Sequence, residues 1–156
     1  MPSVLFICTG NMFRSPIAEV VFRDQLERDG ISGWSVSSAG TWTTPGQPPP
    51  HETVELARSL GLDLSGHLTR LVDESMLAAA DVVLVMEAGH KESLQIEFPE
   101  SRKKVFLLAE VVKGMKYDIP DPAMAMGDPK IILKNLVTLV REGKEQIQRL
   151  VESSSR

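Results

Sequence analysis

A cysteine and an arginine, Cys8 and Arg14, stand six residues apart in the stretch CTGNMFRS near the start of the sequence. A cysteine thiolate is a strong nucleophile, and a guanidinium can offer two parallel N–H donors to an oxyanion. Together they could attack a bound phosphate-like group. Because Cys8 is the only cysteine, a disulfide within the chain and a cysteine-rich zinc site are excluded.

The residues around this pair favour a loop that gathers hydrogen-bond donors. Gly10 lets the backbone bend, and Asn11 tolerates a left-handed conformation. Ser15 and Pro16 predict a helix N-cap followed by proline at the first helical position. Loop amides and the positive end of the helix dipole would then converge on one point and cradle an anion. We therefore predict that the cysteine attacks an anion held by the arginine and the loop amides.

Two other interpretations of this stretch need to be considered. A lone cysteine at the end of a strand can be a buried structural thiol, since cysteine is among the most buried residue types. A nucleotide-binding loop also cradles anions, but it requires a Gly-Lys-Ser or Gly-Lys-Thr sequence, which does not occur in this chain. The apolar run before Cys8 and the helical pattern after Ser15 favour the oxyanion site.

Alternating strands and helices must position this loop. Short apolar runs predict buried parallel strands, and amphipathic stretches between them predict helices. The predicted strands are residues 4–7, 34–38, 81–86 and 104–108, and the predicted helices are residues 15–30, 52–60, 74–80, 91–96 and 131–151, the last interrupted at Gly143. Residues 43–50 and 115–129 are predicted to be irregular. This order implies an α/β fold, a Rossmann-like three-layer sandwich with helices on both faces of a parallel sheet. Ligands bind beyond the carboxyl ends of such strands, where Cys8 lies.

Composition narrows the class of protein further. A chain of 156 residues, 42% of them hydrophobic, suits a single domain spanning residues 1–156. The net charge of −4, with both signs spread along the sequence, argues against nucleic-acid binding. The N-terminus has no secretion signal and no apolar run reaches membrane-spanning length, so we expect a soluble cytoplasmic protein. The three histidines share no metal-ligand spacing, so no metal is predicted, and His51 and His90 are expected to face solvent.

The stretch CTGNMFRS at 8–15 resembles the C-x5-R-S signature of the low-molecular-weight protein tyrosine phosphatases. The resemblance extends to SAGT at 38–41, GLDLSGHLTR at 61–70, ADVVLVM at 80–86 and the Asp-Pro pair at 121–122. It implies a phosphatase I-like fold with a four-stranded parallel sheet. It also implies hydrolysis of phosphotyrosine in protein substrates, without a cofactor or metal, by an enzyme that we expect to be a monomer.

The resemblance assigns roles to the residues of the site. Cys8 would attack phosphorus and form a cysteinyl-phosphate, while Arg14 and the loop amides stabilise the equatorial oxygens. The remaining phosphate-binding and supporting residues that it implies are Thr9, Gly10, Asn11, Met12, Phe13, Ser15, Ser38 and His67. Four of these, Asn11, Ser15, Ser38 and His67, would form a hydrogen-bond network that holds the loop. The hydroxyl of Ser15 would also favour the thiolate as a leaving group.

A general acid must protonate the leaving oxygen. The resemblance points to Asp121, which would afterwards act as the base for water, with Pro122 stiffening its loop. Asp118 stays an alternative, because spacing alone does not separate it from Asp121. Asp128, before Pro129, is expected to be the N-cap of the last helix.

Several positions depart from the family pattern. Phe13 stands where the family often has a second cysteine, so a protective disulfide with the nucleophile cannot form. Ala123 and Met124 replace the aromatic residues that usually follow the Asp-Pro pair, which removes an aromatic wall for a phosphotyrosine ring. Trp42 is a candidate for such a wall or for an ordinary exposed or packing tryptophan, and Met12 and Phe13 are candidates for lining the pocket mouth.

Three alternatives to phosphotyrosine hydrolysis stay open. Arsenate reduction can occur on the same scaffold, although thioredoxin-coupled members use further cysteines, which this chain lacks. A non-catalytic phosphoprotein-binding module is a second alternative, but it would not need a nucleophile together with a proton donor. Phosphoarginine is a third possibility as the substrate, and Met12 gives it no positive support.

Overall fold

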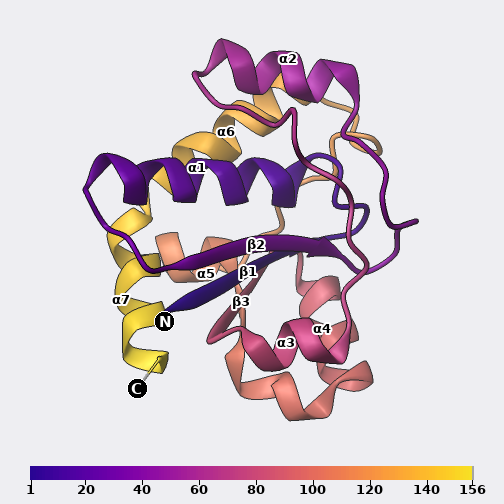
Figure 1. Cartoon of the computed structure of the whole chain (residues 1–156). Coiled ribbons are helices and arrows are strands. Elements are labelled where there is room, and N and C mark those ends of the chain that lie inside the picture. Colours follow the sequence, from indigo (N-terminus) through magenta and orange to yellow (C-terminus); the bar gives the residue numbers. More distant parts are fainter. Residues whose placement is uncertain (156) are drawn as a thin grey trace.

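The computed structural model describes residues 1–155 and has one parallel sheet. Its strand order is β2-β1-β3-β4, with β1 (Ser3–Cys8), β2 (Ser35–Gly40), β3 (Val82–Val85) and β4 (Val105–Leu107). The helices are α1 (Arg14–Arg28), α2 (His51–Ser59), α3 (Glu74–Ala79), α4 (Ala88–Glu97), α5 (Leu108–Lys113), α6 (Pro129–Glu142) and α7 (Lys144–Ser154), with a 3-10 helix η1 (Pro99–Lys104). Helices cover both faces of the sheet (Figure 1). The predicted four-stranded α/β sandwich is therefore confirmed.

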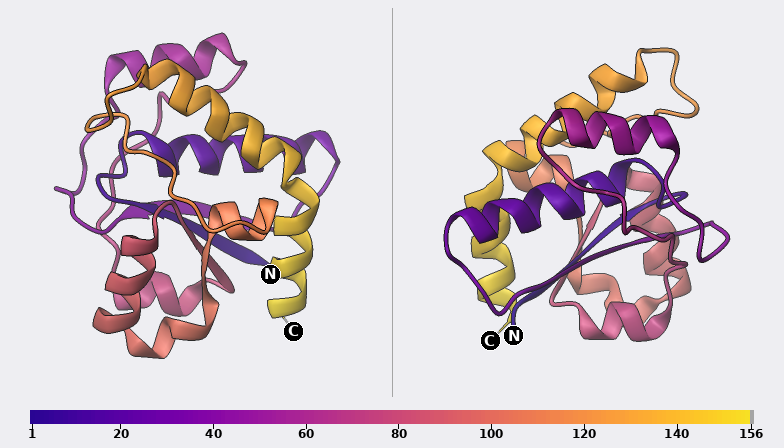
Figure 2. Two further views of the ribbon diagram at one scale, coloured as in Figure 1. Left: turned by 180° about the vertical axis from the view of Figure 1, so that it is seen from behind. Right: turned by 45° about the horizontal axis from the view of Figure 1, so that its top comes forward.

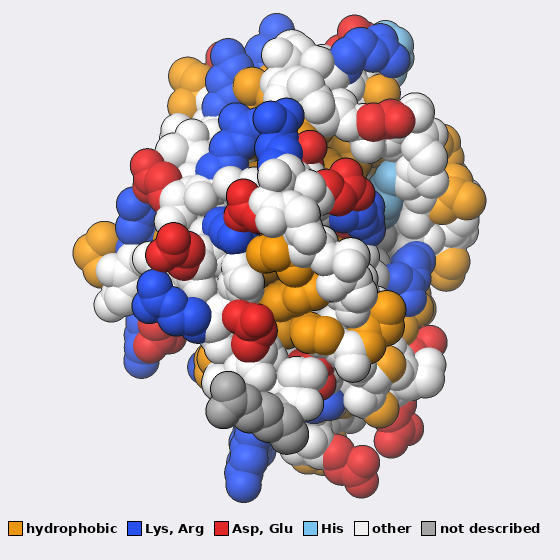
Figure 3. Space-filling model, turned by 60° about the vertical axis from the view of Figure 1, so that its left-hand side comes forward, with side chains coloured by type: hydrophobic (Ala, Val, Ile, Leu, Met, Phe, Trp, Pro, Cys, Tyr) orange, Lys and Arg blue, Asp and Glu red, His pale blue; other side chains and the backbone are white. Residues whose placement is uncertain are grey.

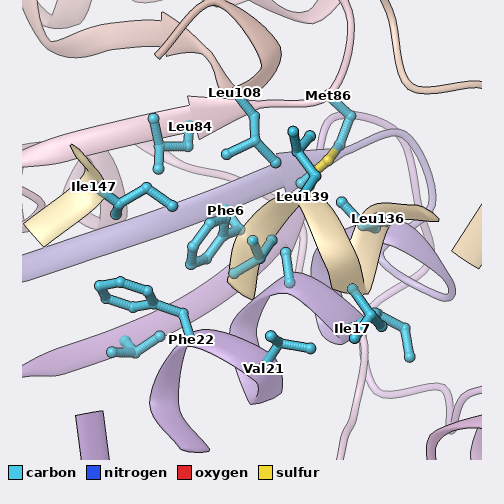
Figure 4. Packing of buried hydrophobic residues seen from close by; sticks show 14 of the residues in the cluster. Phe6, Ile17, Val21, Phe22, Leu84, Met86, Leu108, Leu136, Leu139 and Ile147 are labelled. Atoms are coloured by element: carbon cyan, nitrogen blue, oxygen red, sulfur yellow. The ribbon is translucent and has the colours of Figure 1, made fainter. Parts of the chain in front are cut away.

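The central strand β1 is buried on both faces, as its continuous apolar run predicts. Val4 and Phe6 pack into a core shared with α1, α6 and α7, whereas Leu5 and Ile7 pack into a second core with α3 and α4. Figure 4 shows Phe6 beside Phe22 of α1, where the two rings meet edge to face with centroids 6.0 Å apart. Burial of each such side chain contributes roughly 1.5–3 kcal/mol to folding, so the cores hold β1 rigidly behind the loop that follows it.

The strand register gathers three loops at one edge of the sheet. Cys8 at the end of β1 pairs with Gly40 of β2, and Ile7 pairs with Val85 of β3. Beyond these pairs, the amide of Thr41 donates to the carbonyl of Cys8 at 2.9 Å, and the amide of Met86 donates to that of Ile7 at 3.1 Å. The two views of Figure 2 show the loops after β1, β2 and β3 at the same end of the sheet. This edge is the one at which ligands bind in parallel sheets.

Some element boundaries differ from the predicted ones. β2 runs to Gly40 rather than ending at residue 38, and the last helix is two helices, α6 and α7, divided at Gly143. The short helices η1 and α5 were not predicted, because η1 is a 3-10 helix without the α-helical period and α5 continues directly from the apolar run of β4. Asp128 is the N-cap of α6, as predicted, because its carboxylate accepts a hydrogen bond from the amide of Lys130.

The surface of the described residues carries both signs of charge. Basic and acidic side chains are interspersed on the face drawn in Figure 3. No helix within residues 1–155 is long and apolar enough to cross a membrane.

Candidate active site

The loop after β1 wraps around the sulfur of Cys8, which is 2% exposed. Asn11 has a φ of 56°, the left-handed conformation predicted for it, and its backbone N–H points at Cys8 Sγ over 3.3 Å. The hydroxyl of Ser15 lies 2.9 Å from the same sulfur. An amide N–H and a hydroxyl therefore lie within hydrogen-bond distance of the sulfur that would be the nucleophile.

The structure corrects the predicted role of Ser15 as an N-cap. α1 begins at Arg14, and its N-cap residue is Phe13, without a side-chain cap. The hydroxyl of Ser15 is instead turned into the site, where it accepts a hydrogen bond from Asn11 Nδ2 at 2.8 Å and faces the sulfur of Cys8. The Ser-Pro pattern predicted a cap. The prediction failed because a sequence pattern does not show which distant side chains will bond to the hydroxyl.

Asn11 is the centre of a buried network and is 0% exposed. Its Nδ2 group donates to Ser15 and, at 3.0 Å, to the hydroxyl of Ser38, while its Oδ1 atom accepts from the amide of Arg70 at 2.9 Å. Its carbonyl oxygen lies 2.8 Å from Nε2 of His67. The structure thus brings together all four residues of the predicted network, and it adds the backbone of Arg70. A fully bonded asparagine can hold the strained loop at low cost.

Arg14 is buried beneath the loop and is 1% exposed. Its Nη1 group donates to Glu87 Oε2 at 2.5 Å and to the carbonyl of Ile119 at 2.8 Å. Nη2 lies 3.5 Å from the hydroxyl of Thr9 and 3.7 Å from Asp121 Oδ2. Because Glu87 compensates the buried positive charge, the guanidinium can stay ordered when no anion is bound.

The three aspartates of the segment 115–129 have different partners in the structure. Asp121 is the one that lies beside Arg14, and its Oδ1 atom accepts from the amide of Ala123 at 3.0 Å. Asp118 accepts instead from the amide of Ala88, at 2.8 Å, at the start of α4. Asp128 caps α6. Geometry therefore favours Asp121 over Asp118 as the acid, a choice that spacing alone could not make.

His90 was predicted to face solvent, and this prediction is wrong. The residue is 7% exposed, with Nδ1 accepting from the amide of Glu87 at 3.2 Å and Nε2 lying 2.8 Å from the hydroxyl of Thr9. Burial lowers the pKa of His90, with a smaller lowering by Arg14, whereas Glu87 and two nearby aspartates, Asp118 and Asp121, raise it. The imidazole is therefore neutral at neutral pH.

Glu87 and His90 are the site residues that sequence reasoning missed. The reciprocal bonds between Glu87 and His90 form a capping box at the start of α4, and the two side chains reach Arg14 and Thr9 from there. One signal was available in the sequence. Glu87 directly follows the apolar run at residues 81–86 and His90 comes three residues later, and residues in that position lie at the same sheet edge as the loop after β1.

Three side chains were candidates for lining the entrance. Phe13 instead lines a separate hollow of about 310 Å³, together with Thr53, Leu56 and Pro122. Trp42 is 84% exposed, and its backbone N–H donates to the carbonyl of Thr9 at 3.0 Å. Trp42 is therefore an exposed tryptophan rather than a packing one, and it stays a candidate for the substrate-ring wall. Met12, at the top of the loop, is half-buried.

Gly40 leaves space for the loop, which makes Gly40→Ala a test of the loop geometry. A Cβ atom there would lie 2.5 Å from the carbonyl oxygen of Thr9 and 3.1 Å from the amide nitrogen of Asn11, so the loop would have to move. Displacement of catalytic groups by an ångström can cost about 100-fold in rate. We expect Gly40→Ala to lower kcat/KM by about that factor, measured by release of p-nitrophenol from p-nitrophenyl phosphate.

Gly143→Ala is the matched control, because its Cβ would lie 2.6 Å from Val112 Cγ1, between α5 and α7 and outside the loop. Both substitutions overpack the structure, which typically costs about 1–3 kcal/mol in the free energy of unfolding. Only Gly40→Ala should lower kcat/KM of the folded fraction. Full activity in Gly40→Ala, with a lowered melting temperature, would show that the loop does not depend on this close approach.

A sandwich of this kind, with a cysteine and an arginine in one anion-binding loop, fits the class of cysteine-dependent phosphatases. The family model described as low molecular weight phosphotyrosine protein phosphatase matches residues 3–155. The chain belongs to this family of phosphatases, as its sequence suggested.

Individual relatives carry two kinds of name. A Ralstonia nicotianae protein named as a probable low molecular weight protein-tyrosine-phosphatase, EpsP, is 32% identical over 151 residues, which are 97% of this chain and 92% of that protein. A Bacillus subtilis protein-arginine-phosphatase is 38% identical over 120 residues, 76% of this chain and 78% of its own length. A structure of the arginine phosphatase YwlE, in which a serine replacing the cysteine is phosphorylated, has a TM-score of 0.84 and 32% identity, covering 95% of this chain and 99% of that chain.

Proposed function

We propose that this protein hydrolyses phosphotyrosine in proteins without a metal ion, by way of a cysteinyl-phosphate on Cys8. The observation that carries the proposal is the position of Cys8 Sγ. It is approached by the amide of Asn11 and the hydroxyl of Ser15, with the guanidinium of Arg14 buried beside the same loop. The phosphorylated serine of the YwlE structure supports the same role for the residue at this position.

In the first step the thiolate of Cys8 attacks phosphorus, so that a sulfur–phosphorus bond forms as the bond to the leaving oxygen breaks. Arg14 Nη1 is occupied by Glu87 and Ile119, so the Nη2 and Nε groups are the donors that we propose for the equatorial oxygens. Loop amides supply the other donors. Asp121, beside Arg14, donates its proton to the leaving oxygen.

In the second step water attacks the cysteinyl-phosphate. Asp121, now ionised, takes a proton from the water as its oxygen bonds to phosphorus and the sulfur–phosphorus bond breaks. The electron pair returns to Cys8 as a thiolate, and the hydroxyl of Ser15 at 2.9 Å can donate to it. The positive charge that a metal would otherwise provide comes from Arg14, which is the reason for proposing a metal-independent reaction.

The exposed ring of Trp42 supports an aromatic substrate. Its backbone is bonded to the loop at Thr9 and its side chain is exposed, and we propose that the ring takes the place of the aromatic wall lost at Ala123 and Met124. The name of the Bacillus subtilis relative makes phosphoarginine the second candidate substrate. Family membership argues against the arsenate reductase and binding-module alternatives. Monomeric state and cytoplasmic location stay predictions.

Two peptides of one sequence, carrying either phosphotyrosine or phosphoarginine, would test the substrate. We expect chelator-resistant phosphate release with a higher kcat/KM for phosphotyrosine. Trp42→Ala should raise KM for the phosphotyrosine peptide by roughly 3- to 10-fold, since aromatic contacts contribute about 0.5–1.5 kcal/mol, and should change KM for phosphoarginine less. A higher kcat/KM for phosphoarginine would reassign the substrate, and inhibition by the chelator would refute metal independence.

A further inference from the structure

The hydroxyl of Thr9 stands between two buried nitrogen donors. His90 Nε2 lies 2.8 Å from Thr9 Oγ1, and Arg14 Nη2 approaches the same oxygen to 3.5 Å. Thr9 directly follows the nucleophile and is half-buried, whereas His90 and Arg14 behind it are almost inaccessible. The exposed part of Thr9 is therefore the part that His90 and Arg14 do not cover.

The backbone of Glu87 fixes which nitrogen of His90 carries the proton. The amide of Glu87 can only donate, so His90 Nδ1 must be its unprotonated acceptor, at 3.2 Å. Burial lowers the pKa of His90, which is therefore neutral and holds its single proton on Nε2. The imidazole consequently donates to Thr9 rather than accepting from it.

With this tautomer of His90, the hydroxyl proton of Thr9 is not used in the hydrogen bond to the imidazole. A hydroxyl has one proton to donate and two lone pairs with which to accept. His90 Nε2–H uses one lone pair of Thr9 Oγ1, and Arg14 approaches the oxygen as a second donor. The carboxylate of Glu87 is bonded to Arg14 at 2.5 Å, and the structure shows no hydrogen bond between it and Thr9. Within residues 1–155, no side chain or carbonyl accepts the proton of Thr9.

We propose that the Thr9 hydroxyl donates a hydrogen bond to a phosphoryl oxygen of the substrate, and that His90 is the positioning residue that orients it. The inference rests on the proposed function to the extent that an oxyanion must bind in the loop. It adds a side-chain donor to the loop amides and the guanidinium. It also explains why a histidine is buried on the opposite side of Thr9 from the solvent.

Binding of inorganic phosphate, measured by calorimetry at neutral pH on the full chain, tests the hydroxyl directly. A hydrogen bond to a charged group is worth about 1.5–3 kcal/mol, which corresponds to about 10- to 100-fold in affinity. We therefore expect Thr9→Val to raise the Kd of phosphate by at least 10-fold. Thr9→Ser, which keeps the hydroxyl, should stay within about threefold of the wild type. An equal loss of affinity in both variants would overturn the proposal, as would an unchanged Kd in Thr9→Val.

His90 is tested in combination with Thr9. His90→Phe, which cannot donate, should raise the Kd several-fold in the wild-type background and hardly at all in Thr9→Val. His90→Gln, which retains a side-chain N–H donor, should restore most of the affinity. Such non-additivity is expected only for residues that act through each other. Additive effects would show that His90 supports Glu87 and Arg14 independently of Thr9, and would overturn its assigned role.

The binding measurement keeps this proposal separate from the proposed function. If the wild type binds phosphate but releases none from phosphopeptides, the proposed function fails while the role of Thr9 can still be decided. Melting temperatures of all variants identify any that fail to fold, and the two conservative variants, Thr9→Ser and His90→Gln, keep the test decisive if Thr9→Val or His90→Phe does not fold. The affinity pattern must also follow the hydroxyl rather than the melting temperature.

Discussion

Cys8→Ser should abolish turnover of p-nitrophenyl phosphate, with kcat falling by at least about 10⁴-fold, the scale of loss when a nucleophile is removed. A serine hydroxyl is almost fully protonated in this loop and is a far weaker nucleophile than a thiolate. The amide of Asn11 and the hydroxyl of Ser15, which face the sulfur of Cys8, cannot remove a proton from serine. Release of p-nitrophenol at mildly acidic pH, with a chelator present, measures the effect.

Phosphate binding by the same variant is the internal control. Arg14 and the loop amides are unchanged in Cys8→Ser, so the Kd of inorganic phosphate should stay within a few-fold of the wild-type value. Lost binding would mean that the substitution has disrupted the loop rather than removed the nucleophile. Turnover near the wild-type rate, with binding intact, would show that another group attacks phosphorus.

Asp121→Asn should lower kcat/KM much more for substrates with a poor leaving group than for substrates with a good one. Asparagine has nearly the size of aspartate but has no proton to supply, so a poor leaving group such as the tyrosine phenolate must depart without help. We expect kcat/KM for a phosphotyrosine peptide to fall by about 10²- to 10⁴-fold and that for p-nitrophenyl phosphate to fall far less. The ratio kcat/KM is the correct quantity, because it excludes the later step in which Asp121 is the base.

Asp118→Asn is the matched control for this prediction. Asp118 lies three residues earlier in the same segment, but its carboxylate is bonded to the amide of Ala88 rather than placed beside Arg14. Its substitution should change kcat/KM for both substrates by a small and equal factor. Equal losses for the two substrates in Asp121→Asn, or a leaving-group effect in Asp118→Asn, would move the general acid to Asp118.

The sequence predicted the parts of this protein that depend on local signals. Continuous apolar runs identified the strands, and because parallel strands end at one edge, the position of Cys8 directly after the first run was enough to assign it to a ligand site. The left-handed conformation of Asn11 and the cap at Asp128 followed from the properties of single side chains. The network around Asn11 was implied by family resemblance rather than by spacing, since Ser38 and His67 lie far along the chain.

The remaining features depend on distant neighbours, which spacing cannot show. Ser15 has the sequence of an N-cap, but its hydroxyl faces Cys8 because the end of β1 packs against the start of α1. His90 looked like a surface residue at a helix start and became buried because α4 begins beside the loop that contains Thr9. Choosing between Asp118 and Asp121 likewise required the position of Arg14.

Ile119 joins the acid-bearing segment both to the residue that follows β3 and to Arg14. Its amide donates to the carbonyl of Met86 at 2.9 Å, and its own carbonyl accepts from Arg14 at 2.8 Å, while its side chain is 5% exposed. Local opening of this segment at Ile119 therefore breaks a bond to the phosphate-binding guanidinium, whereas opening beyond Asp121 does not. The free energy of local opening therefore differs between the base of the segment, at Ile119, and its tip. Opening of its base breaks a bond to the anion site, whereas opening of its tip, from Ala123 onward, breaks the bonds that the amides of Ala123, Met124 and Ala125 donate to Asp121.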